Sequence, residues 1–249
     1  MATLTNKVAL VTGGSRGLGA ATARALADDG ADVAITYVAS KEKAAAVVEE
    51  LTALGVRAAA FRSDQADPAA APELITDVTA HFGGLDILVN NAAIGVNAGI
   101  PVDSPNADVA EWDRMHATNY AGVIAITRAA VKVLREGGRI ITVSSGLGAR
   151  TGVPGTADYA ATKAGITAYT RGIARDLAPR GITANVIQAG LMATDMTPDP
   201  EVLAALTANL AIQRQGLPAE QAEGIRFLAT PAASYITGAV LDTNGGYLA

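Results

Sequence analysis

The strongest constraint on the fold of this 249-residue chain is a regular alternation between two kinds of segment. Short apolar runs rich in β-branched residues occupy residues 7–12, 32–37, 57–61, 85–90, 139–144, 182–187 and 239–242. Longer segments with the apolar spacing of helices separate them, most clearly at 20–29, 41–54 and 72–82. Strands that alternate with helices pair in parallel, and near-continuous apolar strands are typical of a sheet covered on both faces. The pattern therefore predicts a single doubly wound α/β domain over residues 1–249, with about seven parallel strands.

Composition argues against several classes of function. The formal net charge is −5, without a local excess of Lys and Arg, so nucleic acid and anionic membranes are not expected partners. The chain has no cysteine, and its two histidines, His81 and His116, stand apart without other ligands nearby, so we expect no metal site. The first residues lack the features of a signal peptide and no run reaches membrane-spanning length, which leads us to expect a cytoplasmic protein.

A glycine-rich connection follows the first predicted strand. Gly13, Gly17 and Gly19 lie where that strand turns into a helix. Glycines at such a turn let the backbone bend tightly and approach a phosphate without a Cβ in the way. The N-terminus of the helix offers free N–H groups and a positive dipole end to a pyrophosphate, so we predict a dinucleotide-binding loop. The other loop residues expected at the cofactor are Ser15, Arg16 and Leu18.

The end of the second predicted strand favours NADP(H) over NAD(H). NAD sites place an acidic residue there to hold the ribose 2′-hydroxyl, whereas NADP sites neutralise a 2′-phosphate. The strand ends at Tyr37 without an acid, and its one carboxylate, Asp32, stands at its beginning. We expect Arg16 to supply a guanidinium to the phosphate, with Ser40 or Lys41 as a further donor. An exposed loop residue without a ligand is the alternative for Arg16.

Polar residues follow the third and fourth predicted strands. Asp64 and Gln65 come after the third strand, and Asn90 and Asn91 come after the fourth. The carboxyl ends of parallel strands form the edge at which open α/β folds bind ligands, although we expect Asn90 to tie loops together. Asn119 lies in a helical segment, where asparagine is a poor helix former, and indicates either a helix bend stabilised by its amide or a site.

Tyr159 and Lys163 lie four positions apart in a run of helix-forming residues. On a helix their side chains share one face, one turn apart. An ammonium within a few ångströms favours phenolate over phenol, so we expect Lys163 to lower the pKa of Tyr159 from about 10 toward the working pH. A tyrosine tuned in this way is a general acid or base. A surface helix on which the two side chains meet by chance is the alternative.

Together these residues resemble the short-chain dehydrogenase/reductase family. The resemblance rests on Thr12-Gly13-x-x-x-Gly17-x-Gly19, Asn90-Asn91-Ala92, Asn119, Ser145 and Tyr159-x-x-x-Lys163, in the family's order over almost the whole chain. The segment SYITGAVLDTNGG, residues 234–246, is similar to the last strand of the family's bacterial ketoacyl-reductase-like members. The resemblance implies a Rossmann-type fold and the nicotinamide-dependent reduction of a carbonyl group.

The resemblance also implies a role for each matching residue. Tyr159 is the expected proton donor, acidified by Lys163 and by the oxidised nicotinamide, and Lys163 also binds the nicotinamide ribose. Ser145 is expected to donate a hydrogen bond to the substrate oxygen, and Asn119 to hold a water that links Lys163 to solvent. The remaining expected cofactor contacts are Asp64 and Gln65 at the adenine, Asn91 and Ala92 at the adenosine ribose, and Gly190, Met192 and Thr194 at the nicotinamide amide and phosphate.

Three departures from the family's usual pattern concern the site. Ala93 and Ala189 stand where glycine and proline are usual. Ser145 and Tyr159 are 14 positions apart, one more than is usual, so the loop between them has to bulge for Ser145 to reach the same oxygen. Ser144 is the competing candidate, although the preceding strand aligns without a gap and favours Ser145.

We expect an NADPH-dependent reductase that converts a ketone to a secondary alcohol, with a ketoacyl thioester and a free small or cyclic ketone both open as substrates. Residues 190–216 are expected to form a lid over the substrate, with an amphipathic helix packed on the domain as the alternative. An acidic acyl carrier protein needs cations near the mouth of the site; Arg180 offers one, but Glu136 stands where related reductases are basic. The resemblance implies a homotetramer. A cofactor-binding sensor or scaffold without catalysis is the alternative from another class of function.

Overall fold

The computed structural model describes residues 3–95, 100–194 and 200–249, which contain one seven-stranded sheet with the order β3-β2-β1-β4-β5-β6-β7. Every pair of neighbouring strands is parallel. The strands are β1 (Val8–Val11), β2 (Asp32–Tyr37), β3 (Ala58–Arg62), β4 (Leu85–Asn90), β5 (Leu134–Ser145), β6 (Thr183–Ala189) and β7 (Val240–Thr243). The predicted doubly wound α/β fold is confirmed.

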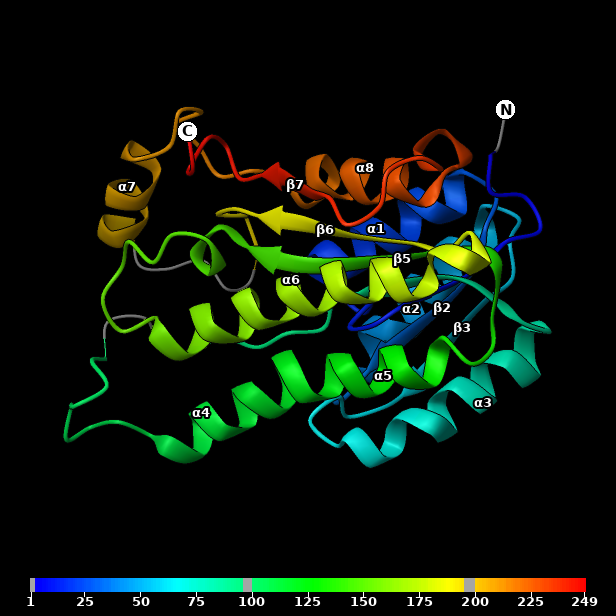
Figure 1. Cartoon of the computed structure of the whole chain (residues 1–249), viewed down its shortest axis with the longest axis horizontal. Coiled ribbons are helices and arrows are strands. Elements are labelled where there is room, and N and C mark those ends of the chain that lie inside the picture. Colours follow the sequence, from blue (N-terminus) through cyan, green and yellow to red (C-terminus); the bar gives the residue numbers. More distant parts are fainter. Residues whose placement is uncertain (1–2, 96–99, 195–199) are drawn as a thin grey trace.

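Helices cover both faces of the sheet (Figure 1). They are α1 (Gly17–Asp28), α2 (Lys41–Ala53), α3 (Ala71–Phe82), α4 (Val109–His116), α5 (Gly122–Ala130), α6 (Ala157–Leu177), α7 (Pro200–Ala208) and α8 (Pro218–Ala229). One apolar core packs α1, α2 and α8 on the sheet through side chains such as Leu26 and Ile225. A second core packs α3, α5 and α6 on the other face through side chains such as Val78 and Ile126. This burial on both faces explains why the strands are continuous apolar runs.

The strand order reverses between β1 and β4, and the carboxyl ends of the strands meet at one edge of the sheet. Open α/β sheets bind ligands at this position. The glycine connection leaves β1 there, and the segments that follow β4, β5 and β6 start from the same edge. The topology therefore gathers the predicted site residues in one place.

Two elements differ from the sequence prediction. β5 begins at Leu134, whereas the predicted strand began at residue 139, because Leu134 pairs with Leu85 across an irregular register. The helical segment that contains Asn119 is not a regular α-helix, since a π-helix, Ala117–Ala121, joins α4 to α5. Widened turns of this kind occur frequently at functional sites.

α7 stands apart from the body of the molecule (Figure 1). None of its described residues is buried. Its partly buried residues, Leu203, Leu206 and Thr207, lie on one face of the helix, so the lid and the packed amphipathic helix both stay predictions. Residues 195–199 of the predicted lid lie outside the described residues.

Neither a membrane-spanning helix nor a metal-binding cluster is found among the described residues. Within residues 3–95, 100–194 and 200–249, no helix has both the length and the apolar character needed to cross a membrane. The same residues contain no group of three or more His, Cys, Asp or Glu side chains that could hold a metal ion.

Candidate active site

Three glycines shape the loop between β1 and α1, each for its own steric reason. Gly13 has φ of +65°, and a Cβ there would lie 2.9 Å from the Cα of Ala92. A Cβ on Gly19 would lie 2.2 Å from the carbonyl oxygen of Gly13. Gly17 has φ of +55°, and the nearest described atom to a Cβ there belongs to Thr194, 3.7 Å away. The loop therefore packs tightly at Gly13 and Gly19 and leaves space beside Gly17.

The N-terminus of α1 has the features of an anion site. Arg16 precedes the helix in an extended, exposed conformation, and its side chain makes no capping hydrogen bond to the first turn. The first turn has no acidic residue, so no carboxylate of that turn opposes the positive end of the helix dipole. The N–H groups of a first turn lack partners within the helix. These groups and the space beside Gly17 fit the pyrophosphate of a dinucleotide.

Asn91 and Ala92, which follow β4, are locked to the glycine loop. The Thr12 hydroxyl accepts hydrogen bonds from the backbone N–H groups of Asn91 (3.0 Å) and Ala92 (2.9 Å). The Asn91 amide donates to the carbonyl oxygens of Thr12 (2.8 Å) and Gly13 (3.2 Å). Asn91 therefore shapes the loop, and contact with the adenosine ribose stays a prediction for both residues.

The ends of β2 and β3 bring polar and cationic groups to the same edge. Tyr37 ends β2 and is partly buried, as is Ser40, which precedes α2. Arg62 ends β3 directly beside Tyr37 and donates to the carbonyl oxygen of Val38 (3.3 Å). Arg62 is exposed, so it adds a second guanidinium, besides that of Arg16, to the edge where a 2′-phosphate is predicted.

Asp64, after β3, already has protein partners. Its carboxylate forms an ion pair with Arg114 of α4, with 3.1 Å between nitrogen and oxygen. Burial opposes ionisation of Asp64, but hydrogen bonds from the Ala66 N–H and from Arg114 outweigh it and lower the pKa of the carboxyl. Asp64 is thus held ionised, and its predicted adenine contact would share the carboxylate with Arg114.

Gln65 faces the protein interior. Its Nε2 donates to the carbonyl oxygens of Ala92 (2.9 Å) and Thr118 (2.8 Å). Its Oε1 is buried without a hydrogen-bond partner among the described residues. The side chain therefore ties the segment after β3 to the segment after β4 and to the π-helix, and its N–H groups are engaged away from the predicted adenine contact.

The two serines at the end of β5 face different surroundings. Ser144 is buried, donates to the carbonyl oxygen of Lys163 (2.9 Å) and accepts from the hydroxyl of Thr167 (2.9 Å). Ser145 is partly exposed, and its side chain lies near enough to Tyr159 to lower the pKa of the phenol. The fold therefore brings Ser145, and not Ser144, to the phenol.

α6 holds Tyr159 and Lys163 one turn apart, with the ammonium 5.7 Å from the centre of the phenol ring. The Lys163 ammonium is buried and donates to the carbonyl oxygen of Val143 (3.1 Å). Burial lowers the pKa of Lys163 to about 8. Burial also raises the pKa of Tyr159, opposed by the Ser145 side chain. The pKa of Tyr159 is thus raised and not lowered toward the working pH as predicted, because loss of hydration destabilises the phenolate more than Ser145 stabilises it.

Asn119 is fully buried in the π-helix. Its Oδ1 accepts from the N–H of Ile94 (2.9 Å), and its Nδ2 donates to the carbonyl oxygen of the same residue (2.8 Å). The Asn119 amide therefore stabilises the π-helix by joining it to the segment after β4. The water predicted at Asn119 stays a prediction.

The loop after β6 borders the other side of the site. A Cβ on Gly190 would lie 2.5 Å from the Cα of Asn244, so this position accommodates only glycine. Met192 forms an isolated parallel bridge with Gly216. This bridge joins the two ends of the predicted lid, and Thr194 extends from the same loop to the glycine loop.

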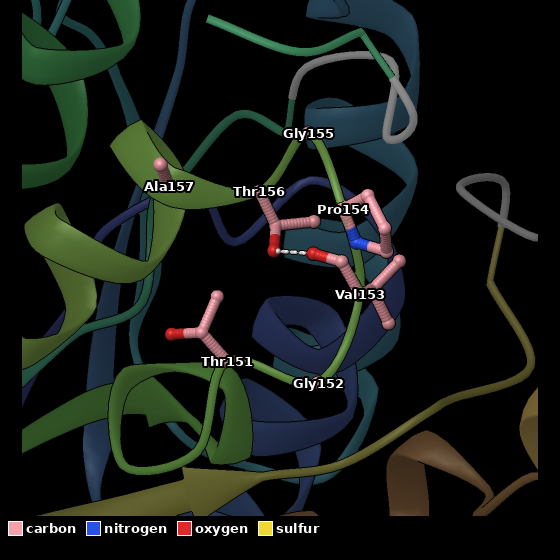
Figure 2. Close-up of a pocket in the computed structure, with 7 residues that line it drawn as sticks. All are labelled: Thr151, Gly152, Val153, Pro154, Gly155, Thr156 and Ala157. Carbon is pink, nitrogen blue, oxygen red and sulfur yellow. Dashed lines mark hydrogen bonds between the residues drawn. The ribbon is translucent and has the colours of Figure 1, made fainter.

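A cavity of about 380 Å³ lies inside the arch formed by the loop between β5 and α6 (Figure 2). The Thr156 hydroxyl donates to the carbonyl oxygen of Val153 (2.6 Å) and closes the arch. A second cavity of about 200 Å³ adjoins the base of the arch. The lining residues are Thr151, Gly152, Val153, Pro154, Gly155, Thr156 and Ala157 for the first, and Ile100, Pro101, Val102, Trp112, Gly155, Ala157 and Asp158 for the second. Apart from Asp158, these side chains are uncharged, and Tyr159 follows them directly.

Comparisons with known proteins agree with this geometry. A family model described as enoyl-(acyl carrier protein) reductase matches residues 13–248. The chain is 42% identical over 246 residues to the 3-oxoacyl-(acyl-carrier-protein) reductase of Staphylococcus aureus, covering 96% of this chain and 97% of that protein. It is 45% identical to a short-chain dehydrogenase from Burkholderia cenocepacia solved in complex with NADP, with a TM-score of 0.95 and coverage of 99% and 100%. The chain belongs to the short-chain dehydrogenase/reductase family.

Another solved relative is a blue fluorescent protein from a metagenomic library in complex with NADPH. It is 43% identical, with a TM-score of 0.94 and coverage of 99% of this chain and 100% of that one. The chain is thus an oxidoreductase of the short-chain dehydrogenase/reductase family whose solved relatives include complexes with NADP and NADPH.

In this short-chain dehydrogenase/reductase, the longer connection between Ser145 and Tyr159 begins with a 3₁₀ turn, Gly146–Gly148. A Cβ on Gly148 would lie 2.9 Å from the backbone nitrogen of Ala164, so the turn packs directly on α6. The extra residue is accommodated without separating the serine from the phenol.

Three side chains that border the site were not predicted from sequence. Arg62 had a signal, because it directly follows the predicted third strand. Arg114 and His116 had none, since their partners Asp64 and Asp158 lie 50 and 42 positions away. The His116 Nε2 lies 2.9 Å from an Asp158 oxygen, which ties α4 to the first turn of α6.

Proposed function

We propose that this chain is an NADP(H)-dependent reductase that converts a ketone to a secondary alcohol. The observation that carries this proposal is the position of Ser145 beside the Tyr159 phenol, with the Lys163 ammonium 5.7 Å from the centre of the same ring. When bound, the nicotinamide supplies or accepts the hydride. The chain supplies a proton, a donor to the substrate oxygen and a fixed orientation.

Tyr159 is the proton donor in this proposal. Its raised pKa keeps the phenol protonated at neutral pH, which suits the reductive direction. As the carbonyl carbon receives the hydride, the oxygen takes the phenolic proton and a hydroxyl forms. Ser145 donates a hydrogen bond to that oxygen and stabilises the charge that develops there. The phenolate that remains is stabilised by the Lys163 ammonium until it is protonated again.

Lys163 and Asn119 support the proton step. Lys163 is anchored to the Val143 carbonyl and, in the proposal, binds the nicotinamide ribose. Asn119 anchors the π-helix through Ile94, and the proposed water between this turn and Lys163 returns a proton from solvent.

The glycine loop and the edge of β2 and β3 support the choice of NADP(H). The loop cradles a pyrophosphate at Gly17, while Arg16 and Arg62 are exposed cations at that edge. We propose that Arg16 contacts the 2′-phosphate, and that Tyr37 and Ser40 border it. The remaining proposed cofactor contacts are Gly13, Ser15, Leu18, Gly19, Asp64, Gln65, Asn91, Ala92, Gly190, Met192 and Thr194.

The uncharged cavities support a neutral carbonyl compound or acyl thioester as substrate. The names of the curated relatives favour a 3-oxoacyl group. Arg180, the cation considered for a carrier protein, donates to Glu136 (2.8 Å) and to the carbonyl oxygens of Val131 and Leu134. Because the charge of Arg180 is paired, we propose a substrate that does not depend on a carrier protein. We also propose that the lid at residues 190–216 covers this substrate.

A panel of small ketones, cyclic ketones and 3-oxoacyl thioesters, each assayed with NADPH and NADH, tests this proposal. The expected result is ketone-dependent oxidation of NADPH with a higher kcat/KM than for NADH, and weaker NADPH binding in Arg16→Ala. Binding of NADPH without turnover of any ketone would instead favour the sensor or scaffold. We also propose a homotetramer in the cytoplasm, and a monomeric mass in light scattering would contradict the assembly.

A further inference from the structure

The C-terminal segment, residues 244–247, turns back from β7 toward the loop between β5 and α6, which follows Ser145. Asn244 is buried, and its Oδ1 accepts from the N–H groups of Gly246 (3.2 Å) and Tyr247 (3.1 Å). Gly245 and Gly246 have φ of +65° and +79°, which allows the sharp turn. The turn directs Tyr247 to the loop between β5 and α6.

Tyr247 is joined to this loop by three contacts with one residue. Its hydroxyl donates to the carbonyl oxygen of Arg150 (3.0 Å), and Arg150 Nη1 donates to the carbonyl oxygen of Tyr247 (3.4 Å). The Arg150 guanidinium carbon also lies 5.7 Å from the centre of the tyrosine ring. Such a contact over a ring adds a cation–π attraction.

Two glycines of the loop leave room for the same ring. A Cβ on Gly146 would lie 2.9 Å from Tyr247 Cδ1, and a Cβ on Gly152 would lie 2.8 Å from its hydroxyl. Gly146 directly follows Ser145, and Gly152 lines the larger cavity. The ring therefore packs against Gly146, the neighbour of Ser145, and against the wall of the larger cavity.

The other side of the C-terminal segment contacts the predicted lid. The N–H of Ile212 donates to the carbonyl oxygen of Gly245 (2.9 Å), and a Cβ on Gly246 would lie 2.5 Å from the Cβ of Ala211. Asn244 meanwhile packs on Gly190 after β6. One short segment thus touches the loop after β5, the loop after β6 and the lid.

We propose that Tyr247 is a positioning residue that fixes the loop carrying Ser145 and the cavity wall, and so sets both the rate of reduction and the fit of the substrate. This inference rests on the proposed ketone reduction. Tyr247 acts through Gly146 and Gly152 and touches no reacting atom in this scheme. It also gives the extra residue of this loop a role, since the lengthened loop is the one that the ring supports.

Tyr247→Ala and Tyr247→Phe test the proposal, with Tyr235→Ala as a matched control because Tyr235 is fully exposed. We expect Tyr247→Ala to lower kcat about 10-fold or more and to raise the KM of the ketone, with the Kd of NADPH within about twofold of the parent value, since small displacements of a positioned group reduce rates strongly. Tyr247→Phe keeps the ring and should retain activity within about threefold. Equal activity of Tyr247→Ala and Tyr235→Ala would overturn the proposal.

Hydrogen exchange of residues 146–156 provides a readout that needs no turnover. The amides of this loop should exchange faster in Tyr247→Ala than in the parent and in Tyr235→Ala, because the loop loses its support. Unchanged exchange would overturn the inference even if activity fell. If the parent turns over no ketone, the proposed function fails, and the exchange measurement still decides whether Tyr247 orders the loop.

A double-mutant cycle covers the case in which Tyr247→Ala does not fold. Gly152→Ala places a methyl group 2.8 Å from the tyrosine hydroxyl, so it should lower kcat/KM in the parent and have a smaller effect in Tyr247→Phe, which lacks that oxygen. Additive effects of the two substitutions would show that the loop and the ring are independent and would contradict the proposal.

Discussion

At the scale of single residues, the proposed site depends on two neighbouring ionisable groups, the buried Lys163 and the partly buried Tyr159. Burial disfavours the charged form of each, so Tyr159 retains its proton more strongly and Lys163 retains its proton less strongly than in water. The phenol is therefore a proton donor over the whole neutral range. The ammonium is the group of the pair that titrates near the working pH.

The pH dependence of reduction should report Lys163. Its pKa of about 8 means that the cation is present below that pH and lost as the pH rises through it. A neutral amine neither stabilises the phenolate nor attracts the anionic cofactor, so kcat/KM for NADPH, which reports the free enzyme, should fall above about pH 8. Initial rates at saturating ketone over a pH series provide the measurement. A profile that stays level up to the ordinary lysine pKa of about 10.4 would contradict this assignment.

The two serines should differ in what their removal costs. Ser145→Ala should lower kcat about 10²- to 10³-fold with normal stability, because it removes a donor to the developing oxyanion. Ser144→Ala removes a buried hydroxyl bonded to Lys163 and Thr167, so it should lower the free energy of unfolding by about 1–3 kcal/mol and reduce kcat less. Steady-state kinetics and urea unfolding separate the two effects. Inactivity of Ser144→Ala, with Ser145→Ala active, would reverse the assignment.

The spacing of Tyr159 and Lys163 on one helix was predictable from sequence, but the electrostatics of the two groups was not. Four positions of helix suffice to place Tyr159 and Lys163 on one face. The direction of the Tyr159 pKa depends on how deeply the phenol is packed, which the local pattern does not contain. The contact between Asn119 and Ile94 spans 25 positions and was likewise not predictable from the local sequence. An asparagine inside a helical segment did, however, indicate a helix bend or a site.

At the scale of elements, the turn from β1 into α1 contains a glycine that is required for two separable reasons. Gly17 needs positive φ, and it leaves open the space where the pyrophosphate is proposed. Gly55 also has positive φ, +88°, and a Cβ there would meet no described atom within 4 Å. The two positions therefore share the backbone requirement and differ in their distance from the proposed cofactor.

Gly17→Ala and Gly55→Ala form a matched pair. Each should cost about 1–2 kcal/mol of stability, because alanine is strained in the left-handed region. Only Gly17→Ala should also weaken NADPH binding, by about 10-fold or more, since its methyl group occupies the phosphate space. Thermal unfolding and titration of NADPH fluorescence measure the two quantities. Equal NADPH affinity of the two variants would place the phosphate elsewhere.

Element boundaries were predictable where local chemistry sets them. β2 and β4 have the predicted ends: Asp32 begins β2, and Gly84 and Asn91 stand on either side of β4. The early start of β5 depends on pairing with Leu85, and the shallow burial of α7 depends on which segments lie beside it in the folded chain. Neither is encoded in the segment itself, which is why the lid and the packed helix remained alternatives.

At the scale of the whole molecule, the parallel, doubly wound sheet was predictable from the alternation of strands and helices together with the handedness of crossovers, whereas its strand order came from the structure. The same order explains why residues from Gly13 to Thr194 meet at one edge. Which distant side chains pair across that edge was not predictable, since Arg114 and Asp64, or Tyr247 and Arg150, come together only after the chain has folded. The sequence therefore indicated the proposed carbonyl reduction, and the tertiary contacts indicate which distant side chains support the residues proposed to carry it out.

The charge distribution of the whole molecule leads to a prediction about the substrate. The chain has a net charge of −5, and Arg180 is paired with Glu136, so an acidic carrier protein meets little electrostatic attraction. A 3-oxoacyl group on acyl carrier protein and the same group on an uncharged small thioester should therefore have kcat/KM values within about 10-fold of each other. Glu136→Arg should raise kcat/KM for the carrier-linked substrate alone, and added salt should remove the gain. A parent enzyme that prefers the carrier-linked substrate by more than about 100-fold, with strong salt dependence, would show that the carrier binds a surface other than the Arg180 region.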